Sequence, residues 1–311
     1  MTFSHNIEDY PEGIVLPIDK PYRWTSADVI RKIKFAAIRH FRKRNLKVGH
    51  AGTLDPLATG LLLVCIGPAT KRAEELQRSD KQYLAGISFG ATTASYDREK
   101  PIDARYPVDG VTEEALRGVL PSFLGPQEQV APLFSAKSVD GQRAYEIARK
   151  AYKARAVISS DHTVISSDHT VISSDHTVIS SEAEKSLSKQ NINIYELELL
   201  KFEEPEISPR ASLGRNDNSA HVQYCTVIPS EAKESTASGR INVIDIAGEG
   251  LPHAEVLVGC SKGTYIRALA RDLGEALGSG AFLDSLRRTR NGGYTLDDAL
   301  SLEEALALFA E

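Results

Sequence analysis

Stretches in which every second residue is apolar occur along much of the chain and predict β-strands. The clearest covers residues 81–90, where the alternation puts Tyr83, Ala85, Ile87 and Phe89 on one face. Similar stretches cover residues 12–18, 192–199, 241–246 and 254–260. Residues 61–66 are apolar without interruption, which is typical of a buried strand.

Other stretches have apolar residues at helical spacing. Thr25 or Ser26 can cap a helix that continues through residues 29–37, and further helices are expected at 70–76 and 111–124. A buried stripe at residues 266, 269, 273 and 277 predicts another helix, and Ser301 with Glu304 forms a capping box for a last one. Helices and strands are therefore both expected.

A seven-residue repeat interrupts this pattern. Residues 157–163 read Val-Ile-Ser-Ser-Asp-His-Thr, and the same residues recur at 164–170 and 171–177 before a fourth copy begins. A coiled coil does not fit, because the only apolar residues of each copy are adjacent. The histidines, His162, His169 and His176, leave a metal array as an alternative, but identical copies favour recent tandem duplication. We expect a polar surface insertion at 156–190 and a second one, rich in Ser, Ala, Asn and Gly, at 208–240.

The composition is that of a soluble globular protein, with 311 residues of which 41% are hydrophobic and 25% charged. No apolar run approaches the roughly 18 residues needed to span a membrane, and the first residues do not form a secretory signal. Cys65, Cys225 and Cys260 are odd in number and widely spaced, which argues against a disulfide framework and a zinc site. We expect a cytoplasmic protein.

The charge is unevenly distributed. The net charge is −5, yet residues 31–47 carry eight lysines and arginines and no acidic residue. This run is either a solvated helix face or a surface for RNA phosphates, and its uniform sign favours the second interpretation.

The basic run leads into a loop that contains one imidazole, His50, and one carboxylate, Asp55. Glycines at 49, 52 and 60 allow positive φ and close approach of the backbone to a ligand. The residue after Asp55 is proline, which biases Asp55 towards an extended backbone. A carboxylate is therefore presented on a stiffened turn.

Residues 49–62, Gly-His-Ala-Gly-Thr-Leu-Asp-Pro-Leu-Ala-Thr-Gly-Leu-Leu, closely resemble the catalytic loop of the tRNA pseudouridine synthase B family. Residues 260–267, Cys-Ser-Lys-Gly-Thr-Tyr-Ile-Arg, match a second family motif without a gap, and residues 286–292 resemble its Leu-Arg-Arg-Thr-Arg-x-Gly. Segments at 81–83 and 132–149 also resemble the family. One departure lies at residues 22–24, Tyr-Arg-Trp, where bulky residues stand in a turn that has glycine in the family.

The resemblance assigns roles to single residues. Asp55 corresponds to the nucleophile, and Arg267 to a bidentate partner that keeps it ionised. Tyr83 corresponds to the tyrosine that stacks on the target uracil and is the candidate to assist loss of the C5 proton; on its own it would pass for a core residue. Tyr265 is a second aromatic wall and Leu286 contacts the base, while His50 fills or props the position that the flipped base leaves.

For Arg287 and Arg288, contacts to phosphates and a solvated turn both stay open. The resemblance implies no metal, nucleotide cofactor or redox partner.

The resemblance implies an α+β fold of the pseudouridine synthase type, with a mixed, largely antiparallel sheet flanked by helices. Residues 1–311 would form a single catalytic domain with two polar insertions and no C-terminal RNA-binding (PUA-like) domain. The implied reaction converts uridine to pseudouridine at position 55 of the T loop, with the T arm of tRNA as partner and no membrane or obligate protein partner. The alternatives are a non-catalytic tRNA-binding or folding module and a pseudouridine synthase acting on other RNA.

Overall fold

The computed structural model describes residues 3–132, 134, 138–139, 142–143, 189–204 and 241–310. The three repeat histidines, Cys225, the second insertion and most of the first lie outside these residues, as does most of the segment 132–149. The expected end of the first insertion, residue 190, is too late, because Gln190 belongs to a strand that begins at Lys189.

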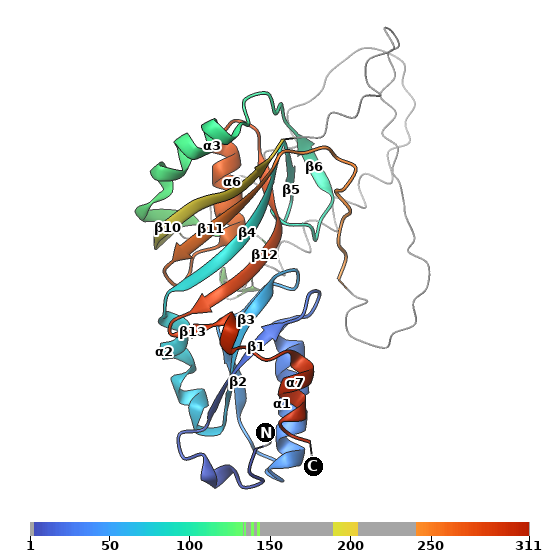
Figure 1. Ribbon diagram of the computed structural model, residues 1–311, viewed down its shortest axis with the longest axis vertical. Helices are drawn as coiled ribbons and strands as arrows, with labels where there is room; N and C mark the ends of the chain where they lie inside the picture. The colour runs from blue at the N-terminus through green and yellow to red at the C-terminus, as the bar shows by residue number, and fades with distance from the viewer. Residues whose placement is uncertain are drawn as a thin grey trace.

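A nine-stranded sheet forms the centre of the molecule (Figure 1). Its main path runs β1-β3-β12-β4-β11-β10-β7, with β2 paired to β3 and β13 to β12. The β12–β3 pair is parallel and the other pairs are antiparallel, so the predicted mixed, largely antiparallel sheet is confirmed. The strands are β1 (Ile14–Lys20), β2 (Val48–Ala51), β3 (Thr59–Ile66), β4 (Lys81–Phe89), β7 (Gly125–Val130), β10 (Lys189–Glu203), β11 (His253–Cys260), β12 (Ala281–Asn291) and β13 (Tyr294–Thr295).

Smaller elements complete the fold. Two hairpins pair β5 (Ala91–Thr93) with β6 (Ile102–Arg105) and β8 (Ser138–Val139) with β9 (Gln142–Arg143). The helices are α1 (Ser26–His40), α2 (Ala73–Arg78), α3 (Glu113–Val119), α6 (Ile266–Ala276) and α7 (Leu302–Ala307), with 3-10 turns η1 (Ile7–Asp9), η2 (Gly67–Arg72), η3 (Leu120–Phe123) and η7 (Leu296–Asp298). Within the described ranges, no helix has the length and apolar composition that a membrane crossing needs.

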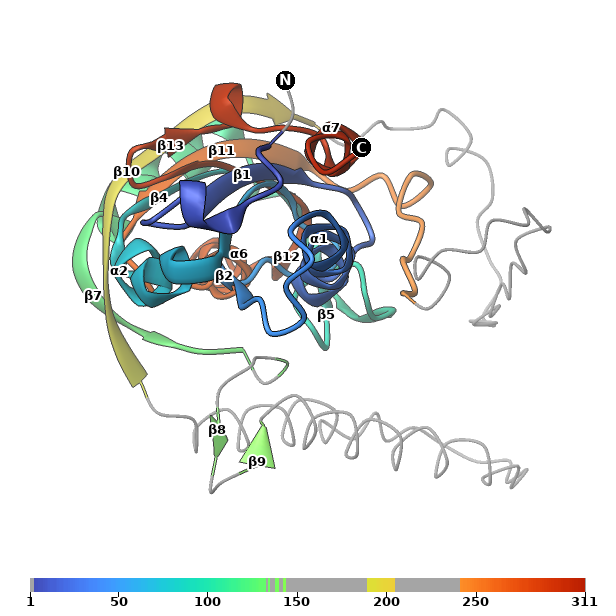
Figure 2. The same cartoon turned by 90° about the horizontal axis from the view of Figure 1, so that it is seen from below.

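The sheet curves around α6, which lies on its concave side together with α1 (Figure 2). The stripe expected on α6 is buried at Ile266, Leu269 and Leu273, and it packs on the face of β4 that carries Ala85 and Ile87. Thr25 is the N-cap of α1, one of the two caps that the sequence allows, and it forms a capping box with Asp28. Burial of these apolar faces fixes α6 against the central strands.

Two predictions about secondary structure are wrong. Residues 241–246 alternate like a strand but pair with no strand of the described chain; backbone groups of Ile244 bond to Arg98 instead. The polar stretch after Leu286 is not a turn but the middle of β12, which lies between β3 and β4. Arg288, in this strand, is 1% exposed.

Candidate active site

Asp55 lies on the loop between β2 and β3. The residues on both sides of it are hydrogen-bonded to the end of β1 and the start of α1. The hydroxyl of Ser26 donates to the Leu54 carbonyl at 3.0 Å and accepts from the Leu54 amide at 2.9 Å. The buried ammonium of Lys20 donates to the Pro56 carbonyl at 3.3 Å. The Asp55 side chain itself is 41% exposed. The loop is thus held by its neighbours while its carboxylate faces solvent.

Arg288 holds the two ends of the same loop. Its Nη2 donates to the Gly52 carbonyl at 3.0 Å and its Nε to the Leu61 carbonyl at 2.7 Å. Gly52 and Gly60 have φ of 93° and 94°, as glycine allows, whereas Gly49 is not left-handed. Because Arg288 is buried against backbone carbonyls, it is a structural residue and both interpretations given to it from sequence are wrong.

Arg267 approaches Asp55 from the first turn of α6. Its Nε donates to Asp55 Oδ2 at 2.9 Å, whereas Nη1 and Nη2 donate to the carbonyls of Ser95 and Phe134, both at 3.0 Å. The expected pairing is confirmed, but one nitrogen makes it where a bidentate fork was expected. The other nitrogens fix the orientation of the guanidinium.

A second carboxylate shares this guanidinium. Asp97 Oδ2 lies 3.7 Å from Arg267 Nη1, and Asp97 Oδ1 accepts from the Ser95 hydroxyl and the Glu99 amide. Burial raises the pKa of Asp97, although Arg267 and these hydrogen bonds oppose the shift. The pKa of Arg267 is raised, because its neighbouring carboxylates outweigh its burial. The cation is therefore permanent and is positioned from several sides.

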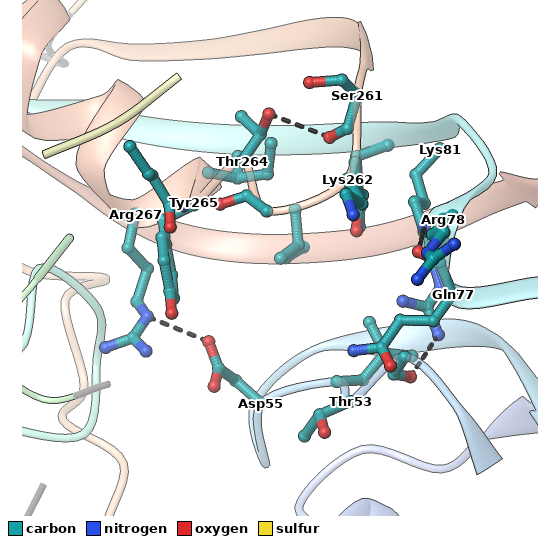
Figure 3. Close-up of a pocket in the computed structure, with 18 of the residues that line it drawn as sticks. Thr53, Asp55, Gln77, Arg78, Lys81, Ser261, Lys262, Thr264, Tyr265 and Arg267 are labelled. Atoms are coloured by element: carbon teal, nitrogen blue, oxygen red, sulfur yellow. Dashed lines mark hydrogen bonds and ion pairs between the residues drawn. The ribbon is translucent and has the colours of Figure 1, made fainter. Parts of the chain in front are cut away.

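Asp55 and Arg267 line a cavity of about 650 Å³ (Figure 3). Tyr83, Tyr265 and Leu286 line it too, so five of the six residues assigned from sequence meet in one cavity. In Figure 3 the ring of Tyr265 lies beside Arg267 and points towards Asp55. This end of the cavity combines a carboxylate, a cation and apolar walls, which suits a flat polar ring such as a nucleobase.

Tyr83 and His50 differ in their relation to the cavity. Tyr83 is 9% exposed, and burial raises the pKa of its phenol although Arg288 opposes the shift. A neutral phenol suits stacking on a base. His50 lies in β2 and is not among the residues that line the cavity. Its imidazole pKa is lowered, mainly by burial and then by the charge of Arg288, and its Nδ1 is buried without a partner among the described residues.

The other end of the cavity is cationic. Arg78, Lys81 and Lys262 lie there, well away from the Asp55–Arg267 pair (Figure 3). Lys81 is 5% exposed and donates to the carbonyls of Gln77 and Ser79; burial is the main reason that its pKa falls to about 8. Glu74 lines the same end and pairs with Arg78, so the cavity has a reactive end and an end whose charge is positive on balance.

Sequence reasoning assigned no role in the site to Lys20, Ser26 or Asp97. Burial is the main cause that lowers the pKa of Lys20 to about 8, and the charge of Asp55 opposes it. Their roles depend on contacts between distant segments. The signal available in the sequence was a polar or charged side chain near a recognised motif.

Family models match two parts of the chain. The model of the TruB family pseudouridylate synthase N-terminal domain matches residues 39–185, and that of the tRNA pseudouridylate synthase B C-terminal domain matches residues 267–311.

Curated relatives match nearly the whole chain. A tRNA pseudouridine synthase B of Phocaeicola vulgatus is 39% identical over 95% of this chain and 92% of its own. Proteins of the same name from Flavobacterium johnsoniae and Deinococcus radiodurans are each 34% identical, over 96% and 93% of this chain and 98% and 77% of their own.

Among solved structures, the fold is similar to a chain of a Cbf5-Nop10-Gar1 complex. The TM-score is 0.54 with 22% identity, and the match covers 97% of this chain and 56% of that one. This chain thus spans little more than half the length of that structural neighbour.

Proposed function

The chain belongs to the TruB family of pseudouridylate synthases, and we propose from this premise that Asp55 is the nucleophile with which it isomerises uridine to pseudouridine in tRNA. The observation that carries the assignment of the site is the 2.9 Å contact between Asp55 and Arg267 inside a cavity with aromatic walls. We further propose that the target uridine is position 55 in the T loop.

Asp55 supplies the electron pair for a covalent step. A carboxylate oxygen bonds to C1' of the ribose as the bond from C1' to N1 breaks. Alternatively it adds to C6 of the ring, the C5–C6 electron pair moves towards O4, and the bond from C1' to N1 then breaks. In both routes the detached ring turns, C5 bonds to C1', the bond to Asp55 breaks, C5 loses its proton and N1 gains one. Arg267 orients the carboxylate for attack, because its other nitrogens are anchored to the carbonyls of Ser95 and Phe134.

The uridine must leave its stack before Asp55 can reach it. We assign Tyr83 and Tyr265 to stack on the extruded uracil and Leu286 to contact its face. Tyr83 also assists loss of the C5 proton: because burial keeps its phenol neutral, it orients the water molecule that accepts this proton and keeps its own. His50 fills the position that the base leaves in the RNA.

The outer face of α1 is a suitable surface for the rest of the tRNA. Phe35 is 73% exposed there, among the exposed cations Lys32, Lys34 and Arg39, which have no carboxylate partner in the described parts of the chain. Like α6, α1 lies on the concave side of the sheet (Figure 2). We propose that these cations bind phosphates next to the T arm while Phe35 contacts sugar or base.

The same proposal covers the organisation of the protein. The chain is one catalytic domain whose insertions at 156–188 and 208–240 do not take part in the chemistry. It works in the cytoplasm, without an obligate protein partner.

Tritium release from C5-labelled uridine in a T-arm minihelix tests the nucleophile. The protein should release tritium, Asp55→Asn should not, and Asp103→Asn, which changes an exposed carboxylate outside the cavity, should match wild type. Release by Asp55→Asn rejects the assignment. If the wild-type protein binds tRNA but releases no tritium from the minihelix or from full-length tRNA, the protein is instead a non-catalytic module.

Charge reversal tests the α1 surface. Arg39→Glu should raise KM for full-length tRNA and flatten its salt dependence by about 0.7 to 0.9 in the logarithmic slope, as expected for one lost phosphate contact. Arg117→Glu, a charge reversal at an exposed position of α3, should leave both unchanged. Equal effects of the two variants would reject this surface.

A further inference from the structure

The turn that departs from the family pattern has an unusual backbone conformation. Arg23 occupies the glycine position of the resembling motif and has a φ of 62°, in the left-handed region. This conformation is strained for a residue with a side chain and unstrained for glycine. The turn geometry is therefore compatible with glycine, yet an arginine stands there.

The Arg23 side chain makes a contact that glycine could not make. Its Nη2 donates to the carbonyl of Ile241 at 2.8 Å, across 218 positions of sequence. Ile241 begins the extended segment 241–246, which the sequence falsely indicated to be a strand. Arg98 holds the same segment, because its Nε and Nη2 donate to the Ile244 carbonyl at 3.0 and 2.7 Å and its carbonyl accepts from the Ile244 amide at 2.9 Å.

Arg23 and Arg98 each lie next to residues that support one member of the Asp55–Arg267 pair. Arg23 lies in the turn between Lys20 and Ser26, which hold the residues on either side of Asp55. Arg98 follows Asp97, which lies 3.7 Å from Arg267. Segment 241–246 therefore links the support of the nucleophile to the support of its cation.

We propose that Arg23 is a positioning residue, which acts through segment 241–246 to fix Asp55 relative to Arg267. The inference rests on the proposed function for its kinetic consequence, but its structural part does not. Without the Arg23 contact, the turn would lose its link to segment 241–246, and the reacting groups would be aligned for a smaller fraction of the time.

Arg23→Gly is a sharp test, because glycine adopts the left-handed backbone without strain and should leave the melting temperature unchanged or higher. We expect kcat to fall about tenfold while KM for tRNA stays within about twofold. The matched control is Tyr22→Ala, which removes a neighbouring side chain that is 44% exposed and should retain wild-type kcat.

A second variant tests whether the segment is the route. Arg98→Ala should lower kcat as well, and the Arg23→Gly/Arg98→Ala pair should lose less than the product of the two single effects, because both act through one segment. A fully multiplicative loss, or a wild-type kcat for Arg23→Gly, would overturn the proposal.

Hydrogen exchange keeps the inference separate from the proposed function. The Ile244 amide should exchange faster in Arg23→Gly than in wild type, while amides of β4 stay protected. Unchanged protection at Ile244 would overturn the proposal whatever the activity. Faster exchange at Ile244 in an enzyme that releases no tritium would reject the assigned reaction and leave the structural link standing.

Discussion

Arg267→Lys is the substitution that separates the geometry of the cation from its charge. The guanidinium serves acceptors in three directions with three nitrogens, at Asp55, Ser95 and Phe134. Lysine keeps the positive charge but concentrates its donors on one nitrogen at the end of a flexible stem. The variant can therefore approach Asp55 or the carbonyls, but it cannot orient itself by all of them.

The contacts of Arg267 set the size of two expected losses, one in stability and one in rate. Arg267 is 6% exposed, and each of the two buried carbonyls that loses its donor costs about 1 to 3 kcal/mol, so the free energy of unfolding should fall by roughly 2 to 6 kcal/mol. We therefore expect a folded but less stable variant. Misplacement of a reacting group by about 1 Å costs about a hundredfold in rate, and we expect kcat to fall by that order.

Arg271→Lys provides the matched control. Arg271 lies one turn further along α6, is 9% exposed and donates to the Val130 carbonyl and to Asp272. It should lose comparable stability in urea denaturation but keep its rate of tritium release when measured well below its melting temperature. If the two variants lose activity equally, stability alone explains the effect and Arg267 has no special role in orienting Asp55.

Two further predictions concern the scaffold. A Cβ on Gly60 would lie 2.3 Å from the Arg288 carbonyl at a φ of 94°, so Gly60→Ala should lower the free energy of unfolding by more than about 2 kcal/mol, whereas Gly49→Ala, with open space around its Cβ, should change it by less than about 0.5 kcal/mol in urea denaturation. His253 Nε2 lies 3.0 Å from Asp284 Oδ2. This contact is the main reason that the pKa of His253 is raised. Burial opposes a low pKa for the Asp284 carboxyl, but the contact with His253 helps to lower it. The pair is therefore most stabilising between the ordinary values of 3.8 and 6.5, and it weakens as pH rises through the raised pKa of His253 or falls through the lowered pKa of Asp284. The stability difference between wild type and His253→Gln should narrow on both sides of this range, and a difference independent of pH would contradict the pairing.

The sequence predicts those strands and helices in which the spacing of apolar residues by itself shows which face is buried. Alternation in 81–90 and 254–260 gives β4 and β11, because each strand has one face on the core. Alternation fails for 241–246, since the pattern shows that one face can be buried but not that a neighbouring strand has a free edge. It also fails for β12, where Arg288 is buried among carbonyls whose positions depend on a loop far away in sequence.

In the candidate site, the sequence likewise predicts the reacting residues but not the residues that hold them in place. Motifs identify Asp55 and Arg267, because the proposed roles depend on a carboxylate and a guanidinium wherever these lie in the fold. No motif shows what orients them, since a loop with left-handed glycines at 52 and 60 has no strong preference of its own for one conformation. The orientation is imposed by Lys20 and Ser26 beside the carboxylate and by Arg288 at the loop ends. Rate in this enzyme should therefore be sensitive to residues that never touch the uridine, and most sensitive where a single side chain holds both ends of the nucleophile's loop.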